Sequence, residues 1–408
     1  MGFVVEEERR LPVSYQADVV VAGGGVAGVA AAVAASRGGA KVLLIERFGQ
    51  LGGMATGGLV TMYLGYGRFE LGLNREIGEA VLGCGAGFIE TSDEWVWIED
   101  MGFSSKKRIV YDAEDMKYLL ERMLLEAGVE VLYHTYIVDT VVEDGAVTGV
   151  VLESKSGRCV AQGRVVVDAT GDGDVFLRAG VDYDVEEHPW GVTLGHRFGG
   201  VDVEGALSFQ REHPEEYGAL IDKLEEIVGL KYRWRTSARE GITLCMGPRL
   251  HGFDVLDPRE STTLEVTGRE IAMKVLEFHR ENVPGFEGAF VVEFAPQFGI
   301  RVTRRVAGEY VLSSEEVRGG ARFDDAVVRS IYDVPYGVLL PKGVENLLVA
   351  GRCISTTKGM DELRLIAPCI ATGEAAGVAA ALAVERRVSP RDLDIGELQA
   401  ALKGRTIP

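Results

Sequence analysis

The sequence predicts an α/β fold built on a mostly parallel sheet, and three stretches of the chain support this prediction. Residues 19–35, VVVAGGGVAGVAAAVAA, change from β-branched residues to alanine across three glycines, which is typical of a buried strand that turns into a helix. Residues 40–46, AKVLLIE, and residues 165–174, VVVDATGDGD, each contain a further buried strand. Strands that alternate with helices in this way favour parallel pairing.

Hydropathy alone allows a second interpretation of residues 19–35, a helix that crosses a bilayer. A membrane span needs about 20 consecutive apolar residues, and Ser36 and Arg37 interrupt this run before that length. Three consecutive glycines also lie near its middle. We therefore expect a strand, a turn and a helix here, and no membrane span.

The turn in this stretch has the spacing of a dinucleotide-binding loop. In Gly23-x-Gly25-x-x-Gly28 the first glycine makes the tight turn, the second lets the backbone approach a pyrophosphate, and the third lets helix and strand pack closely. The free N–H groups of the helix N-terminus then face the phosphates. Glu46 ends the next strand, where a carboxylate accepts hydrogen bonds from a ribose. The predicted contacts in the loop are Gly23, Gly25, Val26, Ala27 and Gly28, in a Rossmann-like fold.

Composition and charge exclude several classes of protein. A chain of 408 residues holds about two domains. Its net charge of −19 argues against nucleic acid and anionic lipid as partners. Five widely spaced cysteines with no C-x-x-C pair indicate free thiols, and the N-terminus does not resemble a signal peptide, so we expect a cytoplasmic protein. The six histidines show no metal-ligand spacing, so we expect no metal.

Four segments resemble the FAD-dependent oxidoreductases whose flavin domain is related to glutathione reductase and fumarate reductase. They are RFGQLGGMATGG at 47–58 after Glu46, the helix, strand and Asp144-Gly145 hairpin of 111–152, the ATG turn at 169–171, and NLLVAGRCIS followed by an alanine-rich helix from about Pro368. Gly52-Gly53 after the acid is typical of flavin proteins in this family. The resemblance implies FAD as the cofactor, with the backbone near Ile137 facing the adenine and the last helix pointing at the flavin N1–O2 edge.

Many relatives carry an acid where this chain has Arg352, so the identity of that contact is open. Beyond the loop and Glu46, the resemblance implies cofactor contacts from Arg47, Gly52, Gly53, Met54, Ala55, Thr56, Ile137, Ala169, Thr170, Gly171, Gly351, Arg352, Pro368, Cys369 and Ile370.

The flavin domain is predicted to be discontinuous. We assign it residues 14–60, 110–183 and 336–386, and we assign a substrate or cap domain of α+β type to the inserts 61–109 and 184–335, which hold all four tryptophans. Residues 387–408 are expected to form a C-terminal tail helix. A second Gly-x-Gly-x-x-Gly after a strand is absent from the sequence, which argues against a separate NAD(P)H domain.

Two stretches hold the candidate catalytic residues. FGIRVTRRVAGEY at 298–310 resembles an arginine-rich segment of the family, and on an alternating strand Arg301 and Arg305 would share one face while Arg304 takes the other. Arginine favours bidentate contact with a carboxylate, which suggests an anionic substrate; the alternative is pairing with nearby glutamates such as Glu309.

STTKGMDELRLIAP at 355–368 precedes the last helix and is expected beside the flavin ring. Relatives carry a histidine in this loop that the chain lacks, which leaves Tyr332 or Tyr336 as further candidates for an acid or base. The candidates from the two stretches are Arg301, Arg304, Lys358, Asp361 and Arg364.

The expected function is hydride transfer between FAD and a small polar, carboxylated substrate, with an electron acceptor or donor that the sequence does not identify. The chain is expected to act without nucleic acid or membrane, and a homo-oligomer is possible. Two alternatives stay open. One is flavin-fold chemistry other than simple redox turnover, as in thiazole synthases or tRNA-modifying flavoproteins; the other is an FAD-binding protein that is redox-silent.

Overall fold

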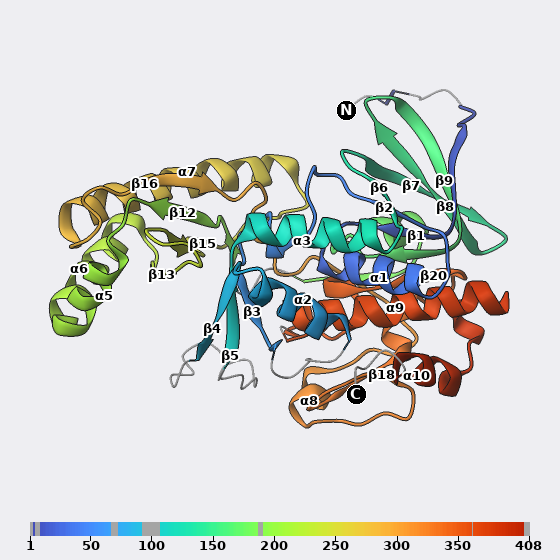
Figure 1. Cartoon of the computed structure of the whole chain (residues 1–408). Helices are drawn as coiled ribbons and strands as arrows, with labels where there is room; N and C mark the ends of the chain where they lie inside the picture. Colours follow the sequence, from blue (N-terminus) through green and yellow to red (C-terminus); the bar gives the residue numbers. More distant parts are fainter. Residues whose placement is uncertain are drawn as a thin grey trace.

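The computed structural model describes residues 3–4, 9–66, 72–91, 107–186, 191–360 and 362–403. Its centre is a seven-stranded sheet in the order β6-β2-β1-β9-β8-β7, with β20 paired to β9 (Figure 1). The strands are β1 (Val13–Ala22), β2 (Val42–Ile45), β6 (Glu130–Leu132), β7 (Tyr136–Glu143), β8 (Ala146–Ser154), β9 (Gly157–Asp168) and β20 (Leu347–Val349). The predicted α/β fold with a parallel sheet and a β-meander is confirmed.

β9 belongs both to the parallel and to the antiparallel part of this sheet. Its first half pairs antiparallel with β8, which the predicted Asp144-Gly145 turn joins to β7. On its other edge β9 pairs parallel with β1 over residues 160–168, and β20 pairs parallel with its last residues, 166–168. The parallel strands β6, β2, β1 and the end of β9 are therefore continuous with an antiparallel meander.

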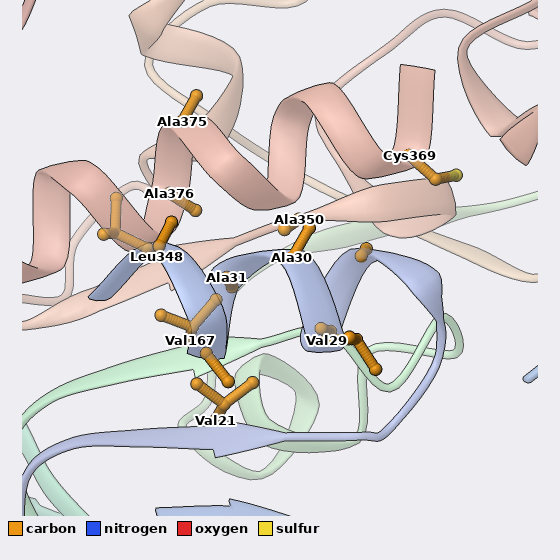
Figure 2. Close-up of a cluster of buried hydrophobic side chains, with 14 of the residues drawn as sticks. Val21, Val29, Ala30, Ala31, Val167, Leu348, Ala350, Cys369, Ala375 and Ala376 are labelled. Atoms are coloured by element: carbon orange, nitrogen blue, oxygen red, sulfur yellow. The ribbon is translucent and has the colours of Figure 1, made fainter. Parts of the chain in front are cut away.

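Two helices made of small residues pack beside the parallel strands. α1 (Val26–Arg37) begins directly after the glycine turn, and α9 (Ile366–Arg386) crosses close to it. A Cβ atom added at Gly373 or Gly377 would lie 2.1 or 2.2 Å from the carbonyl oxygens of Ala27 and Ala31. Figure 2 shows Ala30 and Ala31 of α1 between β1, which carries Val21, and α9, which carries Ala375 and Ala376. The glycines thus permit direct backbone contact between the helices.

α9 is, within the described part of the chain, the one helix long and apolar enough to span a membrane, and 83% of its most apolar window is buried inside the protein. It begins at Ile366, two residues before the predicted start at Pro368. The helix α3 (Ala113–Glu126) also covers the sheet, and Asp112 caps its N-terminus.

The inserted segments form a three-stranded sheet and a four-stranded sheet, besides shorter two-stranded pairs. β3 (Met62–Leu64), β5 (Lys107–Tyr111) and β4 (Gly87–Thr91) make a three-stranded sheet next to α2 (Leu73–Gly83). A four-stranded sheet, in the order β13-β14-β12-β16, packs with α5, α6 and α7 at the other end of the molecule from β8 and β9 (Figure 1). Its elements are β12 (His196–Gly199), β13 (Trp234–Thr236), β14 (Thr243–Cys245), β16 (Phe290–Phe294), α5 (Val203–Glu212), α6 (Pro214–Val228) and α7 (Pro258–Asn282).

Short elements complete the chain. They are α4 (Asp174–Arg178), β10 (Tyr183–Val185), β11 (Val192–Thr193), β15 (Arg249–Leu250), β17 (Arg304–Val306), α8 (Ser314–Arg318), β18 (Ala326–Arg329), β19 (Asp333–Pro335) and α10 (Ile395–Lys403). Val306, Val317 and Val334 belong to the same hydrophobic core as β1 and α9. That core therefore also takes in side chains from the segment that follows β17.

Candidate active site

A cavity of about 530 Å³ opens where the parallel strands β1, β2, β9 and β20 end. The carboxyl ends of parallel strands are where α/β folds bind ligands. One end of the cavity is lined by the meander and α4, and the other by segments of the inserted sheets. Of the predicted cofactor contacts, those that line it are Gly23, Gly25, Val26, Ala27, Glu46, Arg47, Gly52, Gly53, Met54, Ala55, Ile137, Ala169, Thr170, Gly171, Gly351, Arg352 and Cys369.

The glycine turn has the geometry that its spacing predicts. Gly23 has φ +98°, and a Cβ there would collide with the backbone of Ala169. A Cβ at Gly25 would meet nothing within 4 Å, so this residue leaves open space on the cavity side. Gly28 does not line the cavity, because it packs directly against the Gly23 carbonyl oxygen, 1.8 Å from where a Cβ would be. The turn thus leaves a backbone cradle in front of the N-terminus of α1.

Glu46 stands at the end of β2 with its carboxylate fixed by backbone. Its Oε2 accepts a hydrogen bond from the Gly24 N–H at 2.6 Å, and its Oε1 accepts one from the Phe48 N–H at 2.8 Å. Burial raises the pKa of this carboxyl, while these hydrogen bonds oppose the rise. Each oxygen keeps a lone pair with which to accept a ribose hydroxyl.

The Gly52–Ala55 segment runs along the glycine turn. Gly52 pairs with Gly25 in an isolated bridge, and both Gly52 and Gly53 have positive φ, +98° and +52°. Thr56 faces away from the cavity, and its hydroxyl donates to the Leu51 carbonyl. Thr56 therefore stabilises the loop from the side that faces away from the cavity.

Asp168 and Arg352 hold the ATG turn in place. Asp168 is fully buried and accepts hydrogen bonds from the Thr170 hydroxyl and N–H and from the N–H groups of Val175 and Phe176. Arg352 donates to the Gly171 carbonyl at 2.7 Å, to the Ile300 carbonyl at 2.7 Å and to Asp172 Oδ1 at 2.6 Å. Arg352 thus ties β20 to the turn and to the 300 segment.

At the N-terminus of α9 only part of the predicted set reaches the cavity. Cys369 lines it with a neutral thiol, since burial raises its pKa to about 12. Pro368 and Ile370 are buried but do not line it. The helix begins before the proline, so the first turn that faces the cavity consists of Leu365, Ile366 and Cys369.

The arginine segment differs from the alternating strand expected over residues 298–310. A strand covers only Arg304–Val306, so Arg301 and Arg305 share no strand face. Arg301 lines the cavity and donates to the Gly191 carbonyl. Arg305 forms a buried ion pair with Glu186. Arg304 donates to the Asp172 carbonyl at 3.0 Å, and it lies outside the cavity lining.

The other catalytic candidates are divided in the same way. Arg364 lines the cavity, whereas Lys358 is exposed and lies outside the lining. Asp361 lies outside the described residues. Tyr332 and Tyr336 are buried away from the cavity, and the Tyr336 hydroxyl donates to the Pro390 carbonyl.

Several lining residues were not identified from the sequence. At the meander end they are Thr135, Tyr136, Val138, Glu153, Asp174 and Arg178, and at the inserted end Val60, Met62, Leu64, Thr193, Met246, Gln297, Gly299 and Ile300. The only signal for the second group was its location in or next to the inserts. The two ends differ in character, because methionine and aliphatic residues dominate the inserted end.

The cavity is cationic in an acidic protein. Among described residues its lining holds the arginines Arg47, Arg178, Arg301, Arg352 and Arg364 and the carboxylates Glu46, Glu153 and Asp174. The whole chain carries a net charge of −19. Arg352 and Arg47 also face Asp172, but the lining still holds more arginines than carboxylates, which favours an anionic ligand.

The glycine cradle, the acid at the end of β2 and the cationic lining fit a dinucleotide with a pyrophosphate, and together they define a flavin-type nucleotide-binding enzyme. A sequence model of the family described as FAD dependent oxidoreductase matches residues 18–333 and 328–402. The chain belongs to this family, and its cofactor is FAD. No curated protein matches it.

Solved structures share the fold. A geranylgeranyl bacteriochlorophyll reductase-like protein from Thermoplasma acidophilum is 16% identical, with a TM-score of 0.52 over 96% of this chain and 84% of that one. The p-nitrophenol 4-monooxygenase PnpA from Pseudomonas putida is 13% identical, with a TM-score of 0.55 over 96% and 88%. The anhydrotetracycline hydroxylase OxyS from Streptomyces rimosus is 12% identical, with a TM-score of 0.53 over 95% and 65%. At these identities the likeness concerns the fold.

Proposed function

We propose that this FAD-dependent oxidoreductase transfers a hydride between flavin N5 and a small, carboxylated organic substrate. The observation that carries the proposal is that Arg301 and Arg364 line the same cavity as the glycine turn. Guanidinium groups bind carboxylates in a bidentate geometry, and the surrounding Val60, Met62 and Met246 exclude water from the reacting bond.

When bound, FAD supplies the two-electron chemistry. The chain would orient the cofactor through the glycine turn, Glu46 and the first turn of α9, whose N–H groups favour negative charge near them. Arg301 and Arg364 would fix the substrate carboxylate and so place the adjacent carbon–hydrogen bond. An electron acceptor or donor outside this chain would complete the reaction.

We further propose that the protein works in the cytoplasm, without a nucleic-acid or membrane partner, as a monomer or homo-oligomer. The net charge of −19 supports the first part, because phosphate-rich surfaces repel such a chain. The free cysteines support a reducing compartment.

Anaerobic bleaching of the flavin absorbance with a panel of carboxylates, sugars and amines tests the function. We expect a carboxylate to bleach it, and Arg301→Gln or Arg364→Gln to raise the concentration needed by about 10-fold or more, which corresponds to losing a charge-assisted hydrogen bond. Lys358→Gln is the control, since Lys358 is exposed and does not line the cavity. Bleaching by neutral compounds alone would contradict the proposal.

A further inference from the structure

Two largely buried polar side chains line the inserted end of the cavity, and neither polar group forms a hydrogen bond within the described part of the chain. They are Thr193, 5% exposed, and Gln297, 9% exposed. A buried hydroxyl or amide without a partner costs about 1–3 kcal/mol, and native structures rarely leave such groups unmatched. The polar atoms of both residues are open to the cavity and are not among the fully buried atoms that lack a partner. A ligand that fills the cavity removes them from solvent, so it must itself offer them a hydrogen-bond partner.

The backbone holds both residues firmly while leaving their polar ends accessible. The Gln297 N–H donates to the Gly57 carbonyl at 3.0 Å, and Thr193 pairs with Gly299 in an isolated bridge. These two glycines also make room for the side chains. A Cβ added at Gly57 would lie 2.7 Å from Gln297 Nε2, and one at Gly299 would lie 2.5 Å from Thr193 Oγ1.

The pair lies next to the proposed carboxylate site. Gln297, Gly299 and Arg301 alternate along the chain, and all three line the cavity. Arg301 donates to the carbonyl of Gly191, two residues before Thr193, and Gly299, two residues before Arg301, exchanges backbone hydrogen bonds with Thr193. The two segments therefore run side by side, which brings Thr193 close to Arg301 at the same end of the cavity.

We propose that Thr193 and Gln297 determine specificity, by hydrogen-bonding a hydroxyl or carbonyl oxygen of the substrate whose carboxylate Arg301 and Arg364 hold. The inference rests on the proposed function and narrows its substrate class to small hydroxy or oxo carboxylic acids. A threonine hydroxyl and a glutamine amide each donate and accept, so they match a neutral oxygen in either state of oxidation. A site built in this way rejects an analogue that lacks the oxygen.

The test compares acids that differ by one hydroxyl group, lactate with propionate and malate with succinate. Binding is measured anaerobically by titration calorimetry on the protein whose FAD has been reduced with dithionite, so that the hydroxy acids bind without being oxidised. For at least one pair we expect the hydroxy acid to bind about 10-fold more tightly or better. In the double variant Thr193→Val/Gln297→Met this preference should fall to about 2-fold or less, with affinity for the plain acid unchanged.

The controls separate specificity from folding. Thr193→Ser keeps the hydroxyl and should keep the preference. Thr148→Val removes a buried hydroxyl that has no hydrogen-bond partner among the described residues, in β8 and outside this cavity, and should also keep the preference. Flavin content and melting temperature show that each variant is folded.

The outcomes distinguish the two proposals. If acids bind and Arg301→Gln weakens them, but the hydroxyl confers no preference or the double variant keeps it, the role of Thr193 and Gln297 is overturned and the proposed function stands. If no acid binds the unmodified protein, the carboxylate-binding function fails, and this inference fails with it.

Discussion

The core beside FAD and the core of the inserted sheet are built from different residues. The first consists mainly of valine and alanine from β1, α1, β9 and α9. The second is aromatic, with Phe198, Tyr232, Trp234 and Phe286 packed around the buried histidines His196 and His279. Where backbone must approach backbone or a cofactor, small residues are required. Where volume alone must be filled, large rings and even imidazoles are accommodated.

The largest expected difference between the two regions is their response to acid. Burial lowers the pKa of His196 and of His279 to about 4, from an ordinary value of 6.5. Between pH 6.5 and 4 these histidines are therefore protonated in the unfolded chain but neutral in the folded core. The free energy of unfolding falls as the pH drops through that window. At pH 4 the loss is about 3 kcal/mol for each histidine.

Asp168, beside the flavin turn, shifts in the opposite sense. Burial raises its pKa to about 6 from 3.8, despite the hydrogen bonds that it accepts. Its contribution to stability is present at low pH and is lost as the pH rises through 6. Acid should thus weaken the inserted core and not the flavin core. Denaturant titrations at pH 7 and 4.5 check this with tryptophan fluorescence for the inserts, which hold all four tryptophans, and flavin fluorescence for the rest.

His279→Leu should remove about half of the acid response of the tryptophan signal. His213→Gln is its control, because His213 is exposed and lies outside the buried aromatic core. Equal acid sensitivity of the two signals would show that the regions do not differ in this respect.

The next largest difference in the free energy of unfolding is expected between two glycine-to-alanine substitutions, one in each region. Gly377→Ala puts a Cβ 2.2 Å from the Ala31 carbonyl oxygen, whereas the Cβ of Gly218→Ala in α6 meets nothing within 4 Å. Overpacking against backbone should cost about 3 kcal/mol or more. Gly218→Ala should be neutral or stabilise by up to about 1 kcal/mol. Urea unfolding and flavin content measure both, and a tolerated Gly377→Ala would contradict the close packing of α1 and α9.

A smaller effect is expected where the regions join. Arg197 of β12 donates to Asp112, the cap of α3, at 2.9 Å and also pairs with Glu293. Burial opposes ionisation of Asp112, but the charge of Arg197, the hydrogen bonds from Arg197 and the Glu114 N–H, and the charge of Arg239 together lower the pKa of this carboxyl. Arg197→Met should cost about 3 kcal/mol and separate the tryptophan and flavin transitions. Adding Asp112→Asn should recover part of that loss; transitions that stay coincident would show that the contact does not couple the regions.

The smallest effect is expected at the surface of the inserted region. Arg211 and Glu204 form an ion pair in α5 that is exposed on both sides. Arg211→Gln should change the free energy of unfolding by no more than about 0.5 kcal/mol. It sets the scale against which the Arg197 variant is judged, and both are measured by the same urea titration.

The same contrast explains which parts could be predicted from the sequence. The strand, turn and helix of residues 19–35, the Asp144-Gly145 hairpin and the strand before Asp168 were predicted correctly because each is fixed by local pattern. The contacts of Arg304 and Arg305 could not be predicted in this way. Their partners, Asp172 and Glu186, lie more than 100 residues away in sequence.

Thr193 and Gln297 show the same limit. Neither belongs to a motif, and the cavity wall exists only once β11 meets the segment around Gly299. Local periodicity does not predict this contact, because the contact depends on how segments far apart in the sequence pack. The lining residues at the inserted end of the cavity could therefore be identified only from the structure.

The contact between α1 and α9 can form only late in the synthesis of the chain. α1 is complete at Arg37, but the helix that covers it begins at Ile366. At about 5–20 residues per second, a ribosome takes roughly 15–70 s to make the intervening chain. During that time the alanine face of α1 and the glycine turn have no permanent cover, while the aromatic core, complete by Val291, is able to form first. The cofactor-binding half of this protein, although it begins the chain, is the half that is finished last.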